Sequence, residues 1–274
     1  METIAIFNLK GGVGKTTLTV NLGAALSALG KRVLLVDMDP QQNLSQNLGA
    51  NPMRTVGVED FLRGECRLSS VIRGYRSQFD YIPAGKRLKD LDMALTGRYR
   101  NNPEITRLFS KAFRREELDY DYMLIDCPPS TGLLTTNVLS YVKKVYIPVQ
   151  CHQFALNGSK KTVSYIYRVR TFFNRALAIS AVIPVMYDSR NKLSNAIIQR
   201  LSKAFHNKVT NTKISINVSL AEAPGYGQTI FEYRPDSRGA KDIQQLALEL
   251  LEKEAAATSA EKTAVSEILS DVGV

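Results

Sequence analysis

The residues with the clearest chemical potential form a short glycine-rich run near the start of the chain, Lys10-Gly-Gly-Val-Gly-Lys-Thr-Thr17. Its glycines allow successive backbone N–H groups to turn inward around an anion, as phosphate-binding loops do. Lys15 is placed to reach the β- and γ-phosphates of a nucleoside triphosphate, and the Thr16 hydroxyl suits Mg²⁺. The run therefore predicts a site for a nucleoside triphosphate and Mg²⁺, formed by Gly11, Gly12, Val13, Gly14, Lys15, Thr16 and Thr17.

Lys10 is an addition to the common form of this loop, in which a glycine stands where this chain has Leu9. Because Lys15 already serves the phosphates bound by its own subunit, we expect Lys10 to face outward from the loop. Its expected partner is a nucleotide held by a second copy of the protein, where it would assist catalysis in trans. The alternative is a solvated loop lysine.

Carboxylates follow two other apolar runs that are typical of buried strands. Asp126 ends one run and is placed to hold Mg²⁺. Asp37 and Asp39 flank Met38 at the end of the other, and in an extended chain residues i and i+2 share a face. We expect Asp37 to support the metal shell, with capping of a helix that begins at Gln41 as the alternative.

The elements around these residues alternate between strands and helices. The predicted strands span residues 3–8, 32–37, 81–83, 122–126, 144–149, 179–184 and 214–218, and the predicted helices span 15–29, 103–116, 133–141, 155–173, 192–204 and 240–254. Apolar runs without alternation are typical of parallel strands covered on both faces, so this order predicts an α/β fold with a doubly wound, mostly parallel sheet. Ligands of such folds bind at the carboxyl ends of the strands, where Asn8, Asp37 and Asp126 fall.

The 274 residues suffice for one large core, and we expect a single P-loop domain over residues 1–254. Within it, residues 51–115 are predicted as a helical insertion and surface region, and residues 255–274 as a loosely ordered tail. The chain has no run of 18 apolar residues, so no membrane span is predicted. The first residues do not resemble a signal peptide, and a cytoplasmic protein is therefore expected. Three cysteines without CxxC spacing argue against a disulfide framework or a zinc site.

The net charge of +10 is concentrated in one part of the chain. Residues 158–213 contain eleven Lys and Arg (160, 161, 168, 170, 175, 190, 192, 200, 203, 208 and 213) and one acid, Asp188. A basic surface without a helix-turn-helix or zinc-finger pattern favours binding to DNA of any sequence. A solvated basic face is the alternative. The candidate DNA contacts are Arg190, Lys192, Arg200, Lys203 and Lys213.

The glycine-rich run resembles the deviant Walker A box of the ParA/MinD family of ATPases, and the resemblance extends to about residue 252. Other segments similar to family motifs are Leu34-Leu-Val-Asp-Met-Asp-Pro-Gln-Gln-Asn43, Met123-Leu-Ile-Asp-Cys-Pro-Pro-Ser130, residues 148–158, Glu222-Ala-Pro-Gly-Tyr-Gly227 and Ser237-Arg-Gly-Ala240. The resemblance implies ATP and Mg²⁺ as cofactors, and a role for Asp39 in positioning the attacking water. It also implies an adenine site near Met186, Ala221 and Pro224.

The same resemblance implies an ATPase of the ParA type that positions cargo. ATP would drive a sandwich homodimer that binds nucleoid DNA, and a ParB-like adaptor on the cargo would stimulate slow hydrolysis. The cargo can be a plasmid, a chromosome or an organelle such as a carboxysome. The alternatives are a membrane-cycling ATPase of the MinD type, a metabolic enzyme on the same scaffold, and a DNA-binding module with an inactive nucleotide site. An acidic rather than basic tail argues against the membrane alternative.

Overall fold

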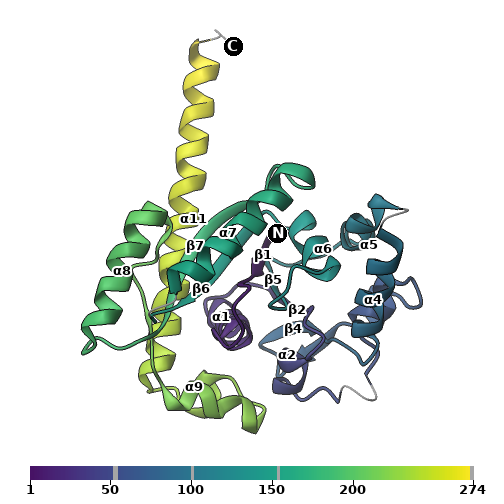
Figure 1. The fold of residues 1–274 in the computed structure, drawn as a ribbon, viewed down its shortest axis with the longest axis horizontal. Helices are drawn as coiled ribbons and strands as arrows, with labels where there is room; N and C mark the ends of the chain where they lie inside the picture. The colour runs from purple at the N-terminus through teal and green to yellow at the C-terminus, as the bar shows by residue number, and fades with distance from the viewer. Residues whose placement is uncertain (52–54, 100–101, 153–154, 272–274) are drawn as a thin grey trace.

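The computed structural model describes residues 1–51, 55–99, 102–152 and 155–271. Its centre is an eight-stranded sheet of order β3-β4-β2-β5-β1-β6-β7-β8 (Figure 1). All neighbouring strands are parallel except β3 and β4, which are antiparallel. The strands are β1 (Glu2–Ile6), β2 (Val33–Asp37), β3 (Arg73–Tyr75), β4 (Phe79–Ile82), β5 (Tyr122–Asp126), β6 (Lys144–Gln150), β7 (Ala178–Tyr187) and β8 (Ile214–Ser215).

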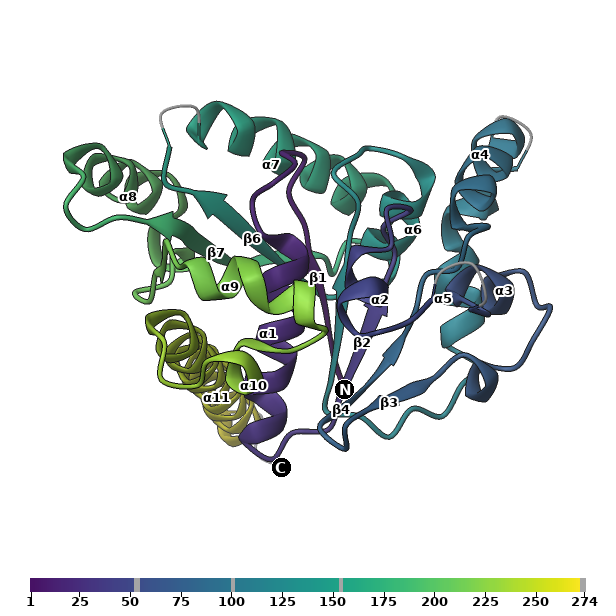
Figure 2. The same cartoon turned by 90° about the horizontal axis from the view of Figure 1, so that it is seen from below.

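Helices cover both faces of the sheet, as Figures 1 and 2 show. The α-helices are α1 (Lys15–Ala28), α2 (Asn43–Asn47), α3 (Val58–Leu62), α4 (Leu88–Tyr99), α5 (Leu108–Phe113), α6 (Leu133–Tyr141), α7 (Ala155–Phe172), α8 (Lys192–Phe205), α9 (Val218–Glu222), α10 (Ile230–Tyr233) and α11 (Arg238–Asp271). The 3-10 helices are η1 (Leu68–Ser70), η2 (Pro103–Arg107), η3 (His206–Lys208) and η4 (Ala223–Tyr226).

The core consists of two apolar clusters, one on each face of the sheet. Successive residues of β1 alternate between them, because side chains of a strand point to opposite faces: Ile4 and Ile6 belong to one cluster, and Ala5 to the other. The first cluster includes α1 and α11, and the second includes α3 to α8. Burial on both faces explains why the strands read as continuous apolar runs.

The helix after the glycine-rich loop has well-defined ends. Gly14 precedes α1 in the left-handed conformation with φ of 77°. At the other end Gly30, with φ of 80°, donates its N–H to Ser27 O, and Lys31 N–H donates to Leu26 O. This pair of bonds is the Schellman arrangement, which satisfies carbonyls left open at a helix end. The helix that carries the phosphate loop is thereby fixed at both ends.

The structure confirms the α/β class and the mostly parallel sheet, and it differs from the sequence prediction in several places. The strand predicted at 214–218 ends at Ser215, and α9 begins at Val218. The strand β3 was not predicted. It pairs with β4, which lies at the strand predicted over residues 81–83, so residues 51–115 contribute two strands to the sheet as well as helices. The helix predicted at 103–116 is a 3-10 helix followed by the shorter α5. Residues 255–271, which belong to the predicted tail, continue α11, because their alanines and long side chains favour a helix and no Gly or Pro interrupts them.

The last helix leaves the body of the protein. In Figure 1 the final turns of α11 project beyond the sheet. No helix within the described residues is both long and apolar enough to cross a membrane. The three cysteines, Cys66, Cys127 and Cys151, are free thiols.

Candidate functional site

The glycine-rich loop connects the carboxyl end of β1 to the first turn of α1. Gly12 and Gly14 have φ of 69° and 77°, in the left-handed region that favours glycine. A Cβ atom built on Gly11, Gly12 or Gly14 would meet no atom within 4 Å, so no neighbouring atom crowds these three positions of the loop. Lys15 is 7% exposed, at the N-terminal end of a helix whose dipole favours an anion. The loop therefore fits a phosphate chain.

Strand pairing brings the predicted carboxylates to the loop. Asp37 of β2 is in register with Asp126 of β5, and Ile6 of β1 is in register with Asp126 on its other side. The Thr16 hydroxyl donates to Asp126 Oδ2 at 2.6 Å. The other oxygen of Asp126, Oδ1, is buried without a hydrogen-bond partner. An unpaired buried carboxylate oxygen beside a threonine hydroxyl fits a divalent cation, because burial without a partner is otherwise costly.

Asp37 and Asp39 have different surroundings from Asp126. Asp37 is fully buried; its Oδ1 accepts from Asp39 N at 3.0 Å, and its Oδ2 accepts from Ser45 N at 2.9 Å and Ser45 Oγ at 2.6 Å. Oδ2 thus bonds the first turn of α2, and Oδ1 bonds the turn that precedes this helix. Asp39 is 6% exposed, and its Oδ1 accepts from Gln41 N at 2.9 Å.

The carboxyl groups repel one another in the ligand-free protein. Burial, and then the charge of Asp37, raise the pKa of Asp126 well above its usual range, against the opposing effects of Thr16 and Lys15. Burial also raises the pKa of Asp37 to about 6, although hydrogen bonds from Ser45 and Asp39 act in the other direction. Among the described residues, no group of three His, Cys, Asp or Glu side chains is arranged to hold a metal ion. A cation here would complete its shell with water and phosphate oxygens, as Mg²⁺ usually does.

Asn8 and Lys10 lie on the other side of the loop. Asn8 is buried, donates to Pro148 O at 2.8 Å and accepts from Lys10 N and from the Thr162 hydroxyl at 3.0 Å each. Lys10 Nζ donates to Gln150 Oε1 at 2.8 Å, at the end of β6. Asn8 therefore shapes the loop from behind, and Lys10 is held at its edge by its own chain.

A pocket of about 460 Å³ opens beside the loop, lined by Gly14, Thr17 and residues from β7, β8 and α9. Met186 and Ala221, two of the three predicted adenine neighbours, line it, whereas Pro224 is not among the lining residues. Met186 has φ of 52°, and the pairing of β7 with β8 shifts register there. Such a bulge turns the Met186 backbone out of the sheet toward the pocket.

Sequence reasoning missed several residues of this pocket. The polar ones include Gln150, His152, Asp188, Asn191, Ser194, Ser215 and Asn217. Asn191 and Asn217 cap the starts of α8 and α9 with side-chain hydrogen bonds to Leu193 N and Leu220 N. For Asn191, the available signal was its position directly before the helix predicted at 192–204. Asn217 lay inside the strand predicted at 214–218 and had no such signal.

The predicted DNA contacts gather at the β7–β8 edge. Lys192, Arg200 and Lys203 are exposed on α8, and Arg190 precedes that helix. The Arg190 side chain is 89% exposed, and its guanidinium pairs with Asp188 through contacts of 3.1 Å. Lys213 Nζ lies 5.5 Å from the centre of the Tyr187 ring. The neighbouring α7 carries further exposed basic residues, Lys160, Lys161, Arg168 and Arg170, and Arg175 is exposed after the end of this helix.

A doubly wound parallel sheet, an open glycine loop before α1 and a buried Asp126 bonded to Thr16 define the class of P-loop nucleotide-binding proteins. The family model described as an AAA domain matches residues 1–179. The chromosome-partitioning ATPase Soj of Treponema pallidum is 39% identical over 92% of this chain and 98% of its own, and the sporulation initiation inhibitor protein Soj of Bacillus subtilis is 41% identical over 91% and 98%. The chain belongs to the ParA/Soj family of partition ATPases.

A solved structure extends this comparison to the fold and the site. Cobyrinic acid a,c-diamide synthase from Mycobacterium smegmatis, with a bound ATP analogue and magnesium, is 30% identical to this chain. It superposes with a TM-score of 0.80 over 92% of this chain and 94% of its own. The ligands in that structure are of the kind that the open loop and the Thr16–Asp126 pair fit.

Proposed function

We propose that this protein is an ATP-dependent positioning ATPase whose ATP-bound dimer binds DNA of any sequence. The observation that carries the proposal is the unpaired Oδ1 of Asp126 beside Thr16, at the mouth of an open phosphate loop and next to a pocket large enough for a nucleoside. A structural ion pair would have satisfied that oxygen. Family membership and the basic face around α8 support the remaining parts of the proposal.

Hydrolysis would use few groups of this chain. The loop N–H groups and Lys15 hold the phosphates, and Thr16 and Asp126 hold Mg²⁺, with Asp37 adding negative charge behind Asp126. When bound, Mg²⁺ neutralises charge on the β- and γ-phosphates. Asp39 orients the attacking water, and Met186 and Ala221 border the base. The released energy serves to switch between two states rather than to make a product.

Replacing Lys10 with Ala is expected to abolish ATP-dependent dimerisation while leaving ATP binding by the monomer nearly unchanged. The reason is that the Lys10 side chain bonds Gln150 alone among the described residues and is positioned at the outer edge of the loop, where a second subunit's phosphates would meet it. Sedimentation velocity with and without ATP measures the dimer, and calorimetric titration measures nucleotide affinity. Lys111→Ala is the control, because it removes one exposed lysine charge on α5, outside the loop and the pocket. Dimerisation of Lys10→Ala as in the wild type would contradict the role in trans.

The test of the proposed function is a mobility shift with random-sequence duplex DNA. Binding is expected with ATP and not with ADP or without nucleotide. Replacing both Arg200 and Lys203 with Ala should weaken binding by about tenfold and lower the slope of log affinity against log salt by about two, because each lost phosphate contact removes about one unit of slope.

The control for this double variant removes the same charge from the opposite edge of the protein. Arg63→Ala with Lys89→Ala alters two exposed residues of the α3–α4 region, and its DNA affinity should match that of the wild type. Equal losses of DNA affinity in both double variants would show that the effect comes from net charge alone. A shift that is indifferent to nucleotide would remove the ATP-gated function.

The cargo adaptor is proposed from family membership. ATP hydrolysis by the dimer on DNA would be slow and would accelerate when an adaptor of the ParB kind binds, which releases the dimer. A nucleoid-associated location in the cytoplasm follows from this cycle.

A further inference from the structure

The chain beyond β8 crosses over the phosphate-loop helix. We call residues 217–233, which contain α9, η4 and α10, the strap. Its first part lines the nucleoside pocket through Asn217, Leu220 and Ala221. Its last part reaches α1, where Ile230 N donates to the buried Asn21 Oδ1 at 2.7 Å. In Figure 2 the strap runs from the β8 side of the sheet across α1 toward β3 and β4.

The far end of the strap meets the turn between β3 and β4. Arg76 and Ser77 are the two central residues of this turn, and Gln78 N closes it by donating to Tyr75 O at 2.8 Å. Both turn residues have left-handed backbones, with φ of 46° and 57°. Two-residue turns of this kind normally carry Asn-Gly, because larger side chains are strained there. A strained turn persists only where surrounding contacts hold it in place, and the side chain of Arg76 makes such contacts.

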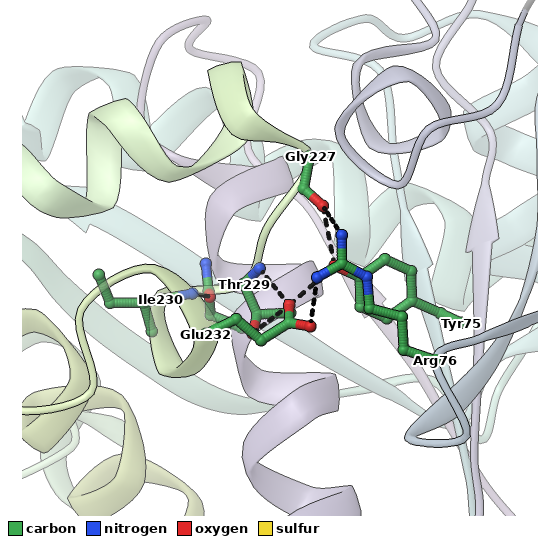
Figure 3. Close-up of polar contacts among 7 residues, drawn as sticks. Tyr75, Arg76, Gly227, Thr229, Ile230 and Glu232 are labelled. Atoms are coloured by element: carbon green, nitrogen blue, oxygen red, sulfur yellow. Dashed lines mark hydrogen bonds and ion pairs between the residues drawn. The ribbon is translucent and has the colours of Figure 1, made fainter.

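The side chains of Arg76 and Tyr75 bind the strap through polar contacts, as Figure 3 shows. Arg76 Nη1 lies 2.7 Å from Glu232 Oε1, and Nη2 donates to Gly227 O at 3.3 Å. The Tyr75 hydroxyl lies 2.8 Å from Glu232 Oε2 and 2.9 Å from Gly227 O. The Glu232 side chain is 17% exposed, so its charge is held by these partners more than by water.

Further hydrogen bonds connect Glu232 to the nucleotide pocket. Glu232 Oε2 accepts from Thr229 N at 2.9 Å and from the Thr229 hydroxyl at 3.0 Å, which closes a capping box at the start of α10. Burial acts against the charged form of Glu232, but these bonds outweigh it and lower its pKa. The next residue, Ile230, binds Asn21, whose Nδ2 donates to Thr17 O at 2.8 Å. Thr17 lines the pocket.

We propose that Tyr75 and Arg76 form a latch that holds the strap closed over α1 and thereby sets the affinity of the pocket for the nucleoside part of the ligand. They are positioning residues, because the latch lies outside the pocket and acts through Glu232 and Asn21. A released strap would lower the fraction of molecules with a complete pocket wall, and apparent affinity falls in proportion to that fraction. The inference rests on the proposed nucleotide site.

Replacing Arg76 with Gly is the sharpest test, because glycine relaxes the strained backbone while the guanidinium is lost. We expect the dissociation constant for a nonhydrolysable ATP analogue with Mg²⁺, measured by calorimetry, to rise about fivefold, the modest size reflecting a half-exposed arginine. The melting temperature of the ligand-free variant should not fall. Tyr75→Phe, which removes only the hydroxyl, should weaken binding in the same direction.

Ser77→Gly is the matched control, since it relaxes the adjacent left-handed residue and leaves the latch intact; its affinity should equal that of the wild type. Tripolyphosphate is the matched ligand, because it occupies the phosphate loop without a nucleoside, and its affinity should be the same in all variants. An Arg76→Gly protein that binds the analogue like the wild type, or that loses tripolyphosphate equally, overturns the latch. A wild-type protein that binds no analogue instead overturns the nucleotide site itself.

Discussion

The Asp126→Asn variant is expected to lose ATP hydrolysis by about 100-fold or more and, without ligand, to be more stable than the wild type at neutral pH. The loss follows because Asp126 is the carboxylate bonded to Thr16, and its free oxygen fits the cation. The gain follows because burial and Asp37 oppose its charge. We expect a gain of about 1–2 kcal/mol, or about 2–8 °C in melting temperature.

The gain in stability has a defined pH dependence. Folding raises the pKa of both Asp37 and Asp126, so the folded protein keeps protons that the unfolded chain has lost. Their contribution to wild-type stability is therefore largest near pH 4 and is lost as pH rises through the folded-state pKa values, that of Asp37 being about 6. The melting-temperature difference between Asp126→Asn and wild type, measured in EDTA, should grow from pH 4 to pH 7.5.

Asp242 provides the matched control for this prediction. Its buried carboxylate accepts from Arg238 Nε and Ser215 N at 2.8 Å and 2.9 Å, so Asp242→Asn should lose stability where Asp126→Asn gains it. An Asp126→Asn protein that melts below the wild type at pH 7.5 would show that Asp126 has a structural role.

The Asp39→Ala variant is expected to hydrolyse ATP about 100-fold or more slowly while binding ATP nearly as well as the wild type. Asp39 is buried near Asp126 and contributes to its electrostatic surroundings, but it bonds neither Thr16 nor a loop group within the described residues. Its removal should therefore spare ground-state binding. The ATP-bound form should accumulate, so DNA binding in ATP should persist longer than in the wild type. A phosphate-release assay and a time course of the mobility shift measure the two effects.

Asp39→Asn separates charge from local structure. The amide oxygen of Asn can still accept from Gln41 N, which Asp39 does at 2.9 Å, but it carries no charge. Equal loss in both variants would assign the effect to the carboxylate as the group that orients water. Recovery of hydrolysis in Asp39→Asn would assign it to the turn after β2 instead.

The sequence predicts the site where its residues are consecutive or end a strand. The loop at 10–17, Asp37 and Asp126 are such residues, and parallel register brings the two carboxylates together as expected. The short edge strand β3 has no comparable signal, because three residues containing a glycine show no period. Pairings such as Arg76 with Glu232, or Lys10 with Gln150, join residues more than one hundred positions apart and depend on packing that no local pattern encodes.

The distance between Asn21 and Ile230 along the chain is 209 residues, and this separation orders events during synthesis. Translation proceeds from the N-terminus, so the phosphate loop leaves the ribosome long before β8 and the strap. Likewise, the two edges of the central strand β1 can be paired only after β5 and β6 have been synthesised. A nascent chain that ends before Ile214 carries the groups that hold phosphates but lacks one wall for the base. The pocket is thus complete only when the polypeptide has been made as far as α9, so recognition of a purine would depend on the later part of the chain.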